Sequence, residues 1–430
     1  MKSIIIIVVF FLSVFQSVQA ATFTYLGSKT AEELNAVLSQ ELDGFINYPE
    51  KPNKKYKRPA SGMAKYAVDY YKVEYDSVIP EQDNRPIKAT GLVAIPKLAG
   101  SSALPLLSYQ HGTVFGKTQV PSYAFWNPGT PNYAASYETR FAVAQFSGNG
   151  YVTLAADYFG MGDSTEPEGY LVKASQQQAC LDLYLAVKEW LQAEKNIQET
   201  NLFLSGWSQG GFVTMAFLQK LEEQGIPVHA AGTAAGFDDF YATFVAGIYN
   251  QRKIDANWLS IGFAITVWSY ENYYKRPGLA AETFKPSQLA GTKTIYDRSY
   301  TSEEEFNQIF IDFSRVTKGK DGRPELVLDM KKMLADKFLD PIVFSNSEFA
   351  ELARKSEVVR SYYKTSTRMY YGTLDEALSP PIARLAADYQ KSIGNKNVIA
   401  ALPVAYANHR ATFITAVSKQ LPWFNSIIKK

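Results

Sequence analysis

A serine between two glycines is the strongest chemical signal in the sequence, in Gly206-Trp207-Ser208-Gln209-Gly210. The apolar run Leu202–Leu204 before it predicts a buried strand, and Gln209–Glu223 after it predicts a helix. Small residues on both sides allow the strained turn that presents a serine at the edge of a sheet. The start of the helix also offers backbone N–H groups to an anion. We therefore predict that Ser208 is a nucleophile and that the Gln209 N–H stabilises an oxyanion.

A serine hydroxyl is a weak nucleophile at neutral pH and needs a base beside it. The chain has three histidines, which are His111, His229 and His409. His409 comes just after the last predicted strand, Val398–Val404, and before a final helix, and it follows the serine and the candidate acids in the chain. His229 lies within the predicted strand Val228–Thr233, so we predict that it is a buried core residue. His409 is the predicted base.

A carboxylate must accept a hydrogen bond from the histidine and hold its ring in place. Asp375 follows the predicted strand Thr367–Tyr371 and is the acid that we predict. Two rivals stay open, Glu376 beside it and Asp238, which follows the strand Val228–Thr233. The alternative interpretation of each carboxylate is a solvated loop residue or a helix cap.

The oxyanion needs a second preorganised donor beside the Gln209 N–H. The apolar run Leu104–Tyr109 predicts a strand, and a His-Gly pair follows it. Glycine at this point lets the backbone come close to a substrate. We predict that the Thr113 N–H is the second donor, with the Gly112 N–H as the alternative, and that the side chain of His111 is structural.

Apolar runs that predict strands alternate with segments that predict helices through much of the chain. Ala67–Val78, Ile87–Ile95 and Tyr151–Ala156 are such runs, and Tyr137–Phe146 and Leu171–Glu194 are predicted helices. This alternation predicts an α/β fold with a mostly parallel sheet that has helices on both faces.

Residues 237–364 interrupt the alternation. They contain helix-like segments, among them Ser302–Ser314 and Glu325–Ala335. We interpret this stretch as a helical cap inserted into a core that is formed by residues 21–236 and 365–430. Long insertions of this kind are often binding elements.

The cap contains an apolar stripe at helical spacing, formed by Trp258, Ile261, Ile265 and Trp268. The first interpretation is that this stripe packs the cap onto the core. The second is that part of it lines an apolar tunnel for an acyl chain.

The composition is that of an ordinary globular protein, with 46% hydrophobic residues and a formal net charge of +2 over 430 residues. Basic residues form no dense run, so we predict no nucleic-acid partner. Cys180 is the single cysteine and lies in a helical pattern. It can form no intrachain disulfide, and we interpret it as a buried core residue.

The first 20 residues predict a signal peptide, because Lys2 is followed by the apolar run Ile4–Phe15 and by the small-residue ending Val18-Gln19-Ala20. The apolar run is shorter than the roughly 20 residues that span a bilayer. We therefore predict a periplasmic or secreted protein without stable membrane insertion after cleavage, with an uncleaved N-terminal anchor as the alternative.

These motifs occur in the order that α/β-hydrolases show. They are His111-Gly112, the turn Asp157–Ser164, the serine turn, Gly372–Asp375 and His409. With its long insertion, the chain most resembles bacterial relatives of the fungal secretory lipases. The resemblance implies the α/β-hydrolase fold with an eight-stranded sheet, a Ser208–Asp375–His409 triad and a helical cap over the acyl site. The chain departs from those lipases because it has no pair of cysteines, and Arg410 follows the base where small residues are common.

We therefore predict an exported serine hydrolase that cleaves small-molecule or lipid carboxylic esters through an acyl-enzyme on Ser208, without a metal or organic cofactor. A peptidase or an acyltransferase with the same residues is the alternative within this fold. A binding protein built on a hydrolase scaffold is the alternative outside catalysis. The short stretch before the first predicted strand disfavours an oligopeptidase with a propeller domain, and nothing in the sequence indicates an oligomeric state.

Overall fold

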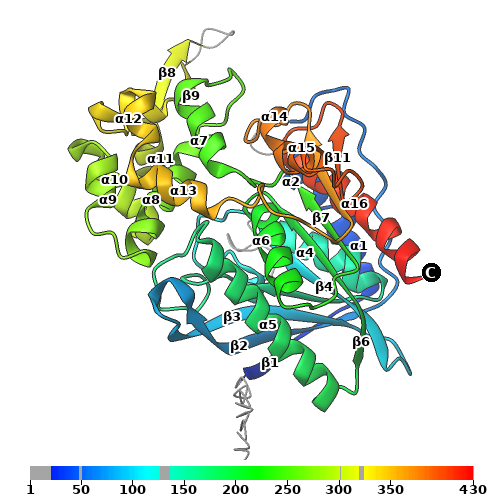
Figure 1. Cartoon of the computed structure of the whole chain (residues 1–430). Coiled ribbons are helices and arrows are strands. Elements are labelled where there is room, and N and C mark those ends of the chain that lie inside the picture. Colours follow the sequence, from blue (N-terminus) through cyan, green and yellow to red (C-terminus); the bar gives the residue numbers. More distant parts are fainter. Residues whose placement is uncertain (1–20, 48–50, 126–135, 301, 319–323, 430) are drawn as a thin grey trace, which may run out of the picture.

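A mixed sheet forms the centre of the molecule in the computed structural model, which describes residues 21–47, 51–125, 136–300, 302–318 and 324–429 (Figure 1). The predicted signal peptide, residues 1–20, lies outside the described residues. The sheet has nine strands in the order β1-β2-β3-β5-β4-β6-β7-β10-β11. Their bounds are β1 Ala21–Lys29, β2 Val68–Ile79, β3 Arg85–Pro96, β4 Ala103–Gln110, β5 Val152–Ala156, β6 Gln198–Trp207, β7 Ala230–Ala234, β10 Thr367–Gly372 and β11 Ile399–Val404.

The sheet is parallel from β5 to β11 and antiparallel among β1, β2, β3 and β5. The predicted α/β class with a mostly parallel sheet is therefore confirmed. The difference is β1, which pairs antiparallel with β2 and adds a ninth strand at the edge. On this edge strand Phe23 stacks on Trp190 with ring centroids 4.0 Å apart, which fastens it to a neighbouring helix.

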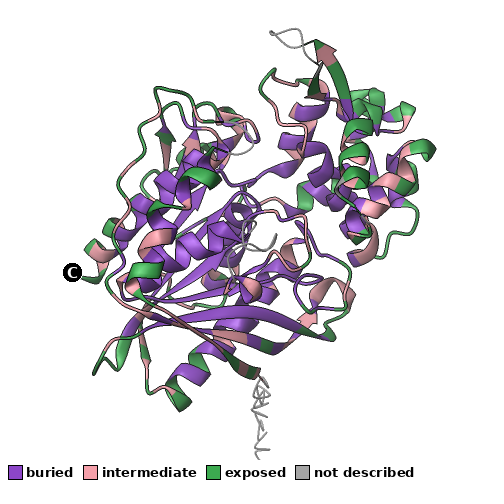
Figure 2. Ribbon diagram, turned by 180° about the vertical axis from the view of Figure 1, so that it is seen from behind, coloured by how far each residue is buried: buried purple, intermediate pink, exposed green. Residues whose placement is uncertain are grey.

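Helices cover both faces of the sheet, and an apolar layer fills each side (Figures 1 and 2). On one face α5 and α6 pack against the strands and each other, and on the other α4 and α16 do so together with α1. The helices of the core and the adjoining short turns are α1 Ala31–Ser39, α2 Leu42–Ile46, η1 Pro80–Gln82, η2 Pro121–Tyr123, α4 Tyr137–Phe146, η3 Ser147–Asn149, α5 Lys173–Glu194, α6 Gln209–Glu223, α14 Pro380–Ala383, α15 Leu385–Ser392 and α16 His409–Ile428. Cys180 lies buried in α5, and burial raises the pKa of its thiol.

The chain between β7 and β10 forms a lobe of its own at one side of the sheet (Figure 1). Its elements are α7 Phe240–Tyr249, α8 Leu259–Tyr273, α9 Leu279–Thr283, α10 Pro286–Asp297, α11 Glu303–Asp312, β8 Ser314–Lys318, β9 Pro324–Leu328, η4 Met330–Lys332, η5 Asp336–Leu339, α12 Pro341–Ser345 and α13 Glu348–Ser356. We refer to residues 237–364 as the insertion. No described helix combines the length and apolar character needed to span a bilayer.

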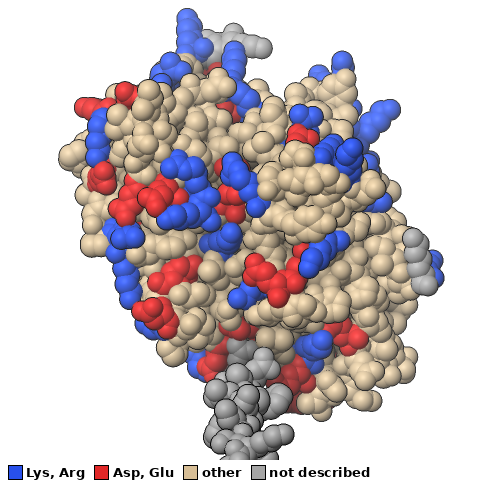
Figure 3. Space-filling model, in the orientation of Figure 1, with Lys and Arg blue, Asp and Glu red and all other residues tan. Residues whose placement is uncertain are grey.

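The insertion is not entirely helical. The prediction of a helix at Glu325–Ala335 is wrong, because β9 pairs antiparallel with β8, with Val316 opposite Leu326. The sequence pattern did not predict β8, the strand with which β9 pairs. On the face drawn in Figure 3, acidic and basic side chains are intermixed over the insertion and the core.

Candidate active site

Ser208 lies at the sharp turn between β6 and α6. Its backbone has φ 59° and ψ −123°, a conformation that costs a residue with a side chain roughly 1–3 kcal/mol. The Ser208 N–H donates to the carbonyl of Ala234, at the end of neighbouring β7, at 2.9 Å. The surrounding sheet therefore holds the serine in a strained position, and strain of this kind is concentrated at functional sites.

Three glycines allow the turn to pack this closely. A Cβ atom on Gly206 would overlap the carbonyl oxygen of Gly210, and one on Gly211 would overlap the Cα atom of Gly236. A Cβ atom on Gly210 would overlap the carbonyl oxygen of Gln110, where the chain leaves β4. Backbone contact thus fixes the serine turn against the loop in which we predict the second oxyanion donor.

Asp375 and His409 meet at the ends of β10 and β11. His409 is the first residue of α16, and its Nδ1 lies 3.0 Å and 3.1 Å from the two carboxylate oxygens of Asp375. Asp375 Oδ1 also accepts the backbone N–H groups of Ala377 and Leu378, at 2.8 Å and 2.9 Å. Both side chains are buried, and His409 Nε2 is without a hydrogen-bond partner among the described residues. The carboxylate orients the ring and leaves the second ring nitrogen available for a proton.

The two rival carboxylates do different things. Glu376 Oε2 accepts the backbone N–H of His409 at 2.9 Å, so its hydrogen bond caps the start of α16 and is not made to the imidazole. Asp238 is buried, and neither of its carboxylate oxygens bonds to a described residue. Burial, with the nearby charges of Glu357 and Asp239, raises the pKa of Asp238 to about 8. The histidine ring therefore has Asp375 as its carboxylate partner in this structure.

The surroundings of His409 set its charge. Burial alone lowers its pKa, but the Asp375 carboxylate, through its charge and its hydrogen bond, and the Glu376 carboxylate raise the pKa above its ordinary value of 6.5. Aromatic rings enclose the imidazole: Trp207 of the serine turn has its centroid 5.0 Å away and Trp258 of the insertion 5.8 Å away. The imidazole is thus shielded from water by residues of the core and of the insertion.

The two predicted second donors of the oxyanion site differ in their bonding. The Gly112 N–H donates to Glu138 Oε1 at 2.6 Å, so this alternative donor is already engaged. Thr113 follows it, and its side-chain hydroxyl lies 2.7 Å from the Tyr170 hydroxyl. Gln209 is the first residue of α6, a position whose N–H has no partner within the helix. The geometry therefore favours Thr113 over Gly112 as the partner of Gln209.

Glu138, at the start of α4, is a buried carboxyl that the sequence did not indicate. It also accepts the Tyr109 hydroxyl at 3.1 Å. Burial raises the pKa of Glu138 to about 7, against the opposing effects of the Gly112 N–H and the Tyr109 hydroxyl. A glutamate in a predicted helix has no local pattern that distinguishes it from a surface residue, and only the packing of α4 under β4 places it here.

The two other histidines are accounted for by their backbone contacts. His111 is buried, with Nδ1 2.7 Å from the Gly112 carbonyl and Nε2 3.2 Å from the Asp157 carbonyl, and burial lowers its pKa to about 4. His229 is exposed in a bend, and its Nδ1 accepts the Leu202 N–H at 3.2 Å. The prediction that His229 lies in a buried strand is wrong, because β7 begins one residue later, at Ala230.

A cavity of about 200 Å³ lies between the insertion and the loop after Asp375. Its lining includes Thr243, Asn250 and Leu259 of the insertion and Ala377 and Ile382 of the core. Arg252, also in this lining, donates to the backbone carbonyl of Asp375 at 2.9 Å. The cavity therefore adjoins the buried Asp375–His409 pair.

Comparisons with known proteins identify the fold that carries these residues. The model of the prolyl oligopeptidase family matches residues 137–251, which contain the serine turn but neither Asp375 nor His409. No curated protein sequence matches the chain. A provisionally named hydrolase from Legionella pneumophila is similar in structure with a TM-score of 0.73 and 19% identity, over 95% of this chain and 98% of that one.

Two further solved structures belong to enzymes with named activities. The rice cell wall degrading esterase LipA from Xanthomonas oryzae gives a TM-score of 0.69 at 19% identity, over 95% of this chain and 96% of that one. Candida antarctica lipase A gives 0.59 at 15% identity, over 80% of this chain and 73% of that one. The sheet order, the serine turn and these likenesses show that the chain has the α/β-hydrolase fold.

Proposed function

We propose that the protein is an exported serine hydrolase that cleaves carboxylic esters through an acyl-enzyme on Ser208. The observation that carries the proposal is the buried Asp375–His409 pair, whose His409 Nε2 bonds to no described residue, at the same edge of the parallel sheet as the strained turn of Ser208. In a fold of this kind, a nucleophile, a base and an orienting acid at the ends of neighbouring strands perform acyl transfer.

The proposed mechanism uses the groups in the roles that their contacts allow. His409 Nε2 takes the proton of the Ser208 hydroxyl as Ser208 Oγ attacks the ester carbonyl. The N–H groups of Gln209 and Thr113 stabilise the oxyanion that forms. His409 then gives the proton to the leaving alcohol. In the second half, His409 removes a proton from water and the resulting nucleophile attacks the acyl-enzyme. His409 then returns the proton to Ser208 Oγ as the acid is released.

The direct test is hydrolysis of p-nitrophenyl esters by the purified protein, with fluorophosphonate labelling of the same preparation. We expect turnover of short and medium-chain esters and one label per chain, on Ser208 by peptide mass. Export is tested separately by sequencing the mature N-terminus, which we expect to be Ala21. Absence of both turnover and labelling would rule out the proposal.

A peptidase is the second candidate, because the matched family model is that of the prolyl oligopeptidases. The matched residues include the nucleophile but not the acid, the base or most of the insertion. The esterase and the lipase among the structural neighbours favour an ester substrate. Parallel kcat/KM measurements on aminoacyl amides and on simple esters distinguish the two, and an amide preference would favour the peptidase.

Glu376→Gln should move the acidic limb of kcat/KM to lower pH. Only the neutral ring of His409 can act as a base, so activity rises as the pH passes through the pKa of His409. The charge of Glu376 is one of the contributions that raise this pKa, and the amide lacks that charge. The glutamine side-chain oxygen can still accept the backbone N–H of His409, as Glu376 does, so α16 keeps its cap.

The measurement is kcat/KM from about pH 5 to about pH 9, and the control is Asp388→Asn, which removes an exposed carboxylate on α15. We expect the limb of the control to stay where the wild type has it. A limb that stays in place or moves to higher pH in Glu376→Gln would contradict the assigned role of His409.

Trp258→Ala should weaken the preference for longer acyl chains. Within the stripe at helical spacing, Ile261 and Ile265 are fully buried and Trp268 is 9% exposed, so these three pack the insertion. Trp258 is half-buried and near His409, where it can contact an acyl chain. Each buried methylene contributes about 0.8 kcal/mol, so loss of contact with two methylenes lowers the octanoate-to-acetate ratio of kcat/KM by roughly 10-fold.

Trp268→Ala is the matched control, because it also removes a tryptophan side chain from the stripe. Trp268 lies within α8, and its ring N–H donates to the Thr292 hydroxyl. We expect it to lower the free energy of unfolding by about 3–5 kcal/mol and to leave the octanoate-to-acetate ratio unchanged. The ratio is independent of the fraction of folded enzyme. A fall of the ratio in the Trp268 variant alone would contradict the assignment.

A further inference from the structure

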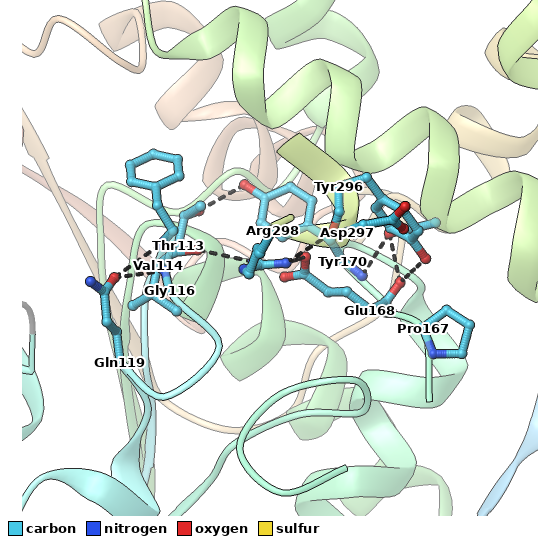
Figure 4. A network of polar contacts seen from close by, with 12 residues as sticks. Thr113, Val114, Gly116, Gln119, Pro167, Glu168, Tyr170, Tyr296, Asp297 and Arg298 are labelled. Carbon is cyan, nitrogen blue, oxygen red and sulfur yellow. Dashed lines mark hydrogen bonds and ion pairs between the residues drawn. The ribbon is translucent and has the colours of Figure 1, made fainter. Parts of the chain in front are cut away.

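Three consecutive residues after Gly112 are held by side chains from outside the loop, and Figure 4 shows the contacts of the first two, Thr113 and Val114. The Thr113 hydroxyl bonds to that of Tyr170 at 2.7 Å. Arg298 Nη2 donates to the Val114 carbonyl at 3.1 Å, and the Tyr300 hydroxyl donates to the Phe115 carbonyl at 2.7 Å. Arg298 and Tyr300 both belong to the insertion. We refer to residues 113–115 as the oxyanion loop.

Arg298 is fixed by a buried ion pair. Its Nη1 lies 2.5 Å from Glu168 Oε2, and the two side chains are only 8% and 6% exposed. Burial alone lowers the pKa of Arg298, but the charge and hydrogen bond of Glu168 raise it above its ordinary value, so the guanidinium stays charged. Glu168 lies in the core, between β5 and α5, so the pair joins the insertion to the core.

The backbone of Glu168 is fastened as well. Its carbonyl accepts the hydroxyls of Ser269, at 2.8 Å, and of Tyr296, at 2.9 Å, both from the insertion. Ser269 Oγ also accepts the Tyr170 N–H at 3.1 Å, and Tyr170 contacts Thr113. Figure 4 shows Arg298, Glu168, Tyr296 and Tyr170 in one network of contacts that runs from the insertion to Thr113 and Val114 of the oxyanion loop.

We propose that Arg298, anchored by Glu168, is a positioning residue that holds the oxyanion loop in its catalytic conformation. The inference rests on the proposed function, in which the Thr113 N–H stabilises the oxyanion. A guanidinium that binds the Val114 carbonyl fixes the Val114–Phe115 peptide plane, which one peptide unit separates from the plane that carries the Thr113 N–H. Oxyanion donors contribute because they are oriented before the charge develops, so the insertion takes part in catalysis through a residue that does not touch the substrate.

Arg298→Met and Tyr300→Phe should lower kcat and leave KM little changed, because the oxyanion exists only after the carbonyl is attacked. Loss of one oxyanion donor lowers kcat roughly 10²–10³-fold in other hydrolases. We expect about 10–100-fold for Arg298→Met, which loosens the donor without removing it, and a smaller loss for Tyr300→Phe. The rate of fluorophosphonate labelling should fall in parallel, because its phosphoryl oxygen occupies the same site.

Tyr273→Phe is the matched control. The Tyr273 hydroxyl, in the insertion, donates to the core carbonyl of Pro167 at 2.8 Å, so its removal breaks the same kind of bond away from the oxyanion loop. We expect kcat within about twofold of wild type, and thermal unfolding of each variant checks that it is folded at the assay temperature.

The proposal is overturned if folded Arg298→Met keeps the wild-type kcat. If Arg298→Met does not fold, Tyr300→Phe, which lacks only one hydroxyl, decides the question. A loss of kcat in Tyr273→Phe as large as in Tyr300→Phe would also overturn it, because general packing of the insertion would then explain both. Failure of the proposed function has a different signature, in which wild type neither hydrolyses esters nor takes up the label.

Discussion

Ser208→Ala should abolish ester hydrolysis in a protein that folds normally. Removal of the nucleophile of a serine hydrolase lowers kcat on the order of 10⁶-fold. The substitution keeps the Cβ atom and deletes one hydroxyl, and the Ser208 N–H can still donate to the Ala234 carbonyl. The measurements are kcat on a p-nitrophenyl ester and thermal unfolding followed by circular dichroism.

Ser205→Ala is the control for this variant. Ser205 lies on β6, three residues before the nucleophile, and its buried hydroxyl donates to Gln420 Oε1 at 2.6 Å. The loss of this bond should lower the free energy of unfolding by about 1–3 kcal/mol and leave ester hydrolysis in place. Turnover of folded Ser208→Ala within tenfold of wild type would show that another residue is the nucleophile.

Asp375→Asn should lower kcat on the order of 10⁴-fold, as loss of the orienting acid does in a serine protease. The amide cannot accept the ring N–H of His409 in the same way, so the ring loses the tautomer that presents a free Nε2. Asp238→Asn is the isosteric control, because Asp238 is also a buried aspartate after a strand, but its carboxylate forms no hydrogen bond with His409 or any other described residue. We expect its activity to be near that of wild type.

The control carries a stability prediction of its own. The pKa of Asp238 is about 8 in the folded protein and about 3.9 in an unfolded chain. Below the unfolded pKa both states are protonated, and the contribution of the group to stability is fully present. As the pH rises towards 8, only the unfolded state ionises, so this contribution is progressively lost.

Asn does not titrate, so Asp238→Asn should be more stable than wild type at pH 7 and should lose this advantage at acid pH. One pKa unit corresponds to about 1.4 kcal/mol, so the gain at pH 7 is of the order of several kcal/mol. Urea unfolding at pH 4 and pH 7 measures it. If Asp238→Asn destroys activity and Asp375→Asn does not, the acid lies after β7 and our assignment is wrong.

Local sequence predicted the elements around the serine because their patterns are strong there. The predicted helices at Tyr137–Phe146 and Gln209–Glu223 coincide with α4 and α6. Both helices are buried along most of their length, and this burial restricts the residue types that they can contain. Edge strands carry a weaker signal. In β1, exposed Tyr25 and half-buried Phe23 alternate with polar residues, and only pairing with β2 makes this segment a strand.

The sequence predicted Asp375 as the acid, in the loop after a strand, but left Glu376 and Asp238 open as rivals. The roles of Asp375 and Glu376 depend on the turn, in which Asp375 accepts the N–H groups of Ala377 and Leu378 and so points at the imidazole. The contacts of Glu138 and Arg298 join segments far apart in the chain. No spacing within a single segment predicts such contacts.

The hydrogen bonds from Arg298 and Tyr300 to the oxyanion loop limit how substrate range can be engineered. The core supplies the proposed nucleophile, acid and base, so exchanging residues 237–364 for the insertion of a known hydrolase is an obvious way to test control of acyl preference. A transplanted insertion would reshape the cavity near Asp375 but would bring no partner for the Val114 and Phe115 carbonyls. Glu168 would be left as a buried charge without its cation. A chimera should therefore retain the short segment 296–300 of this chain, so that recognition changes without loss of rate.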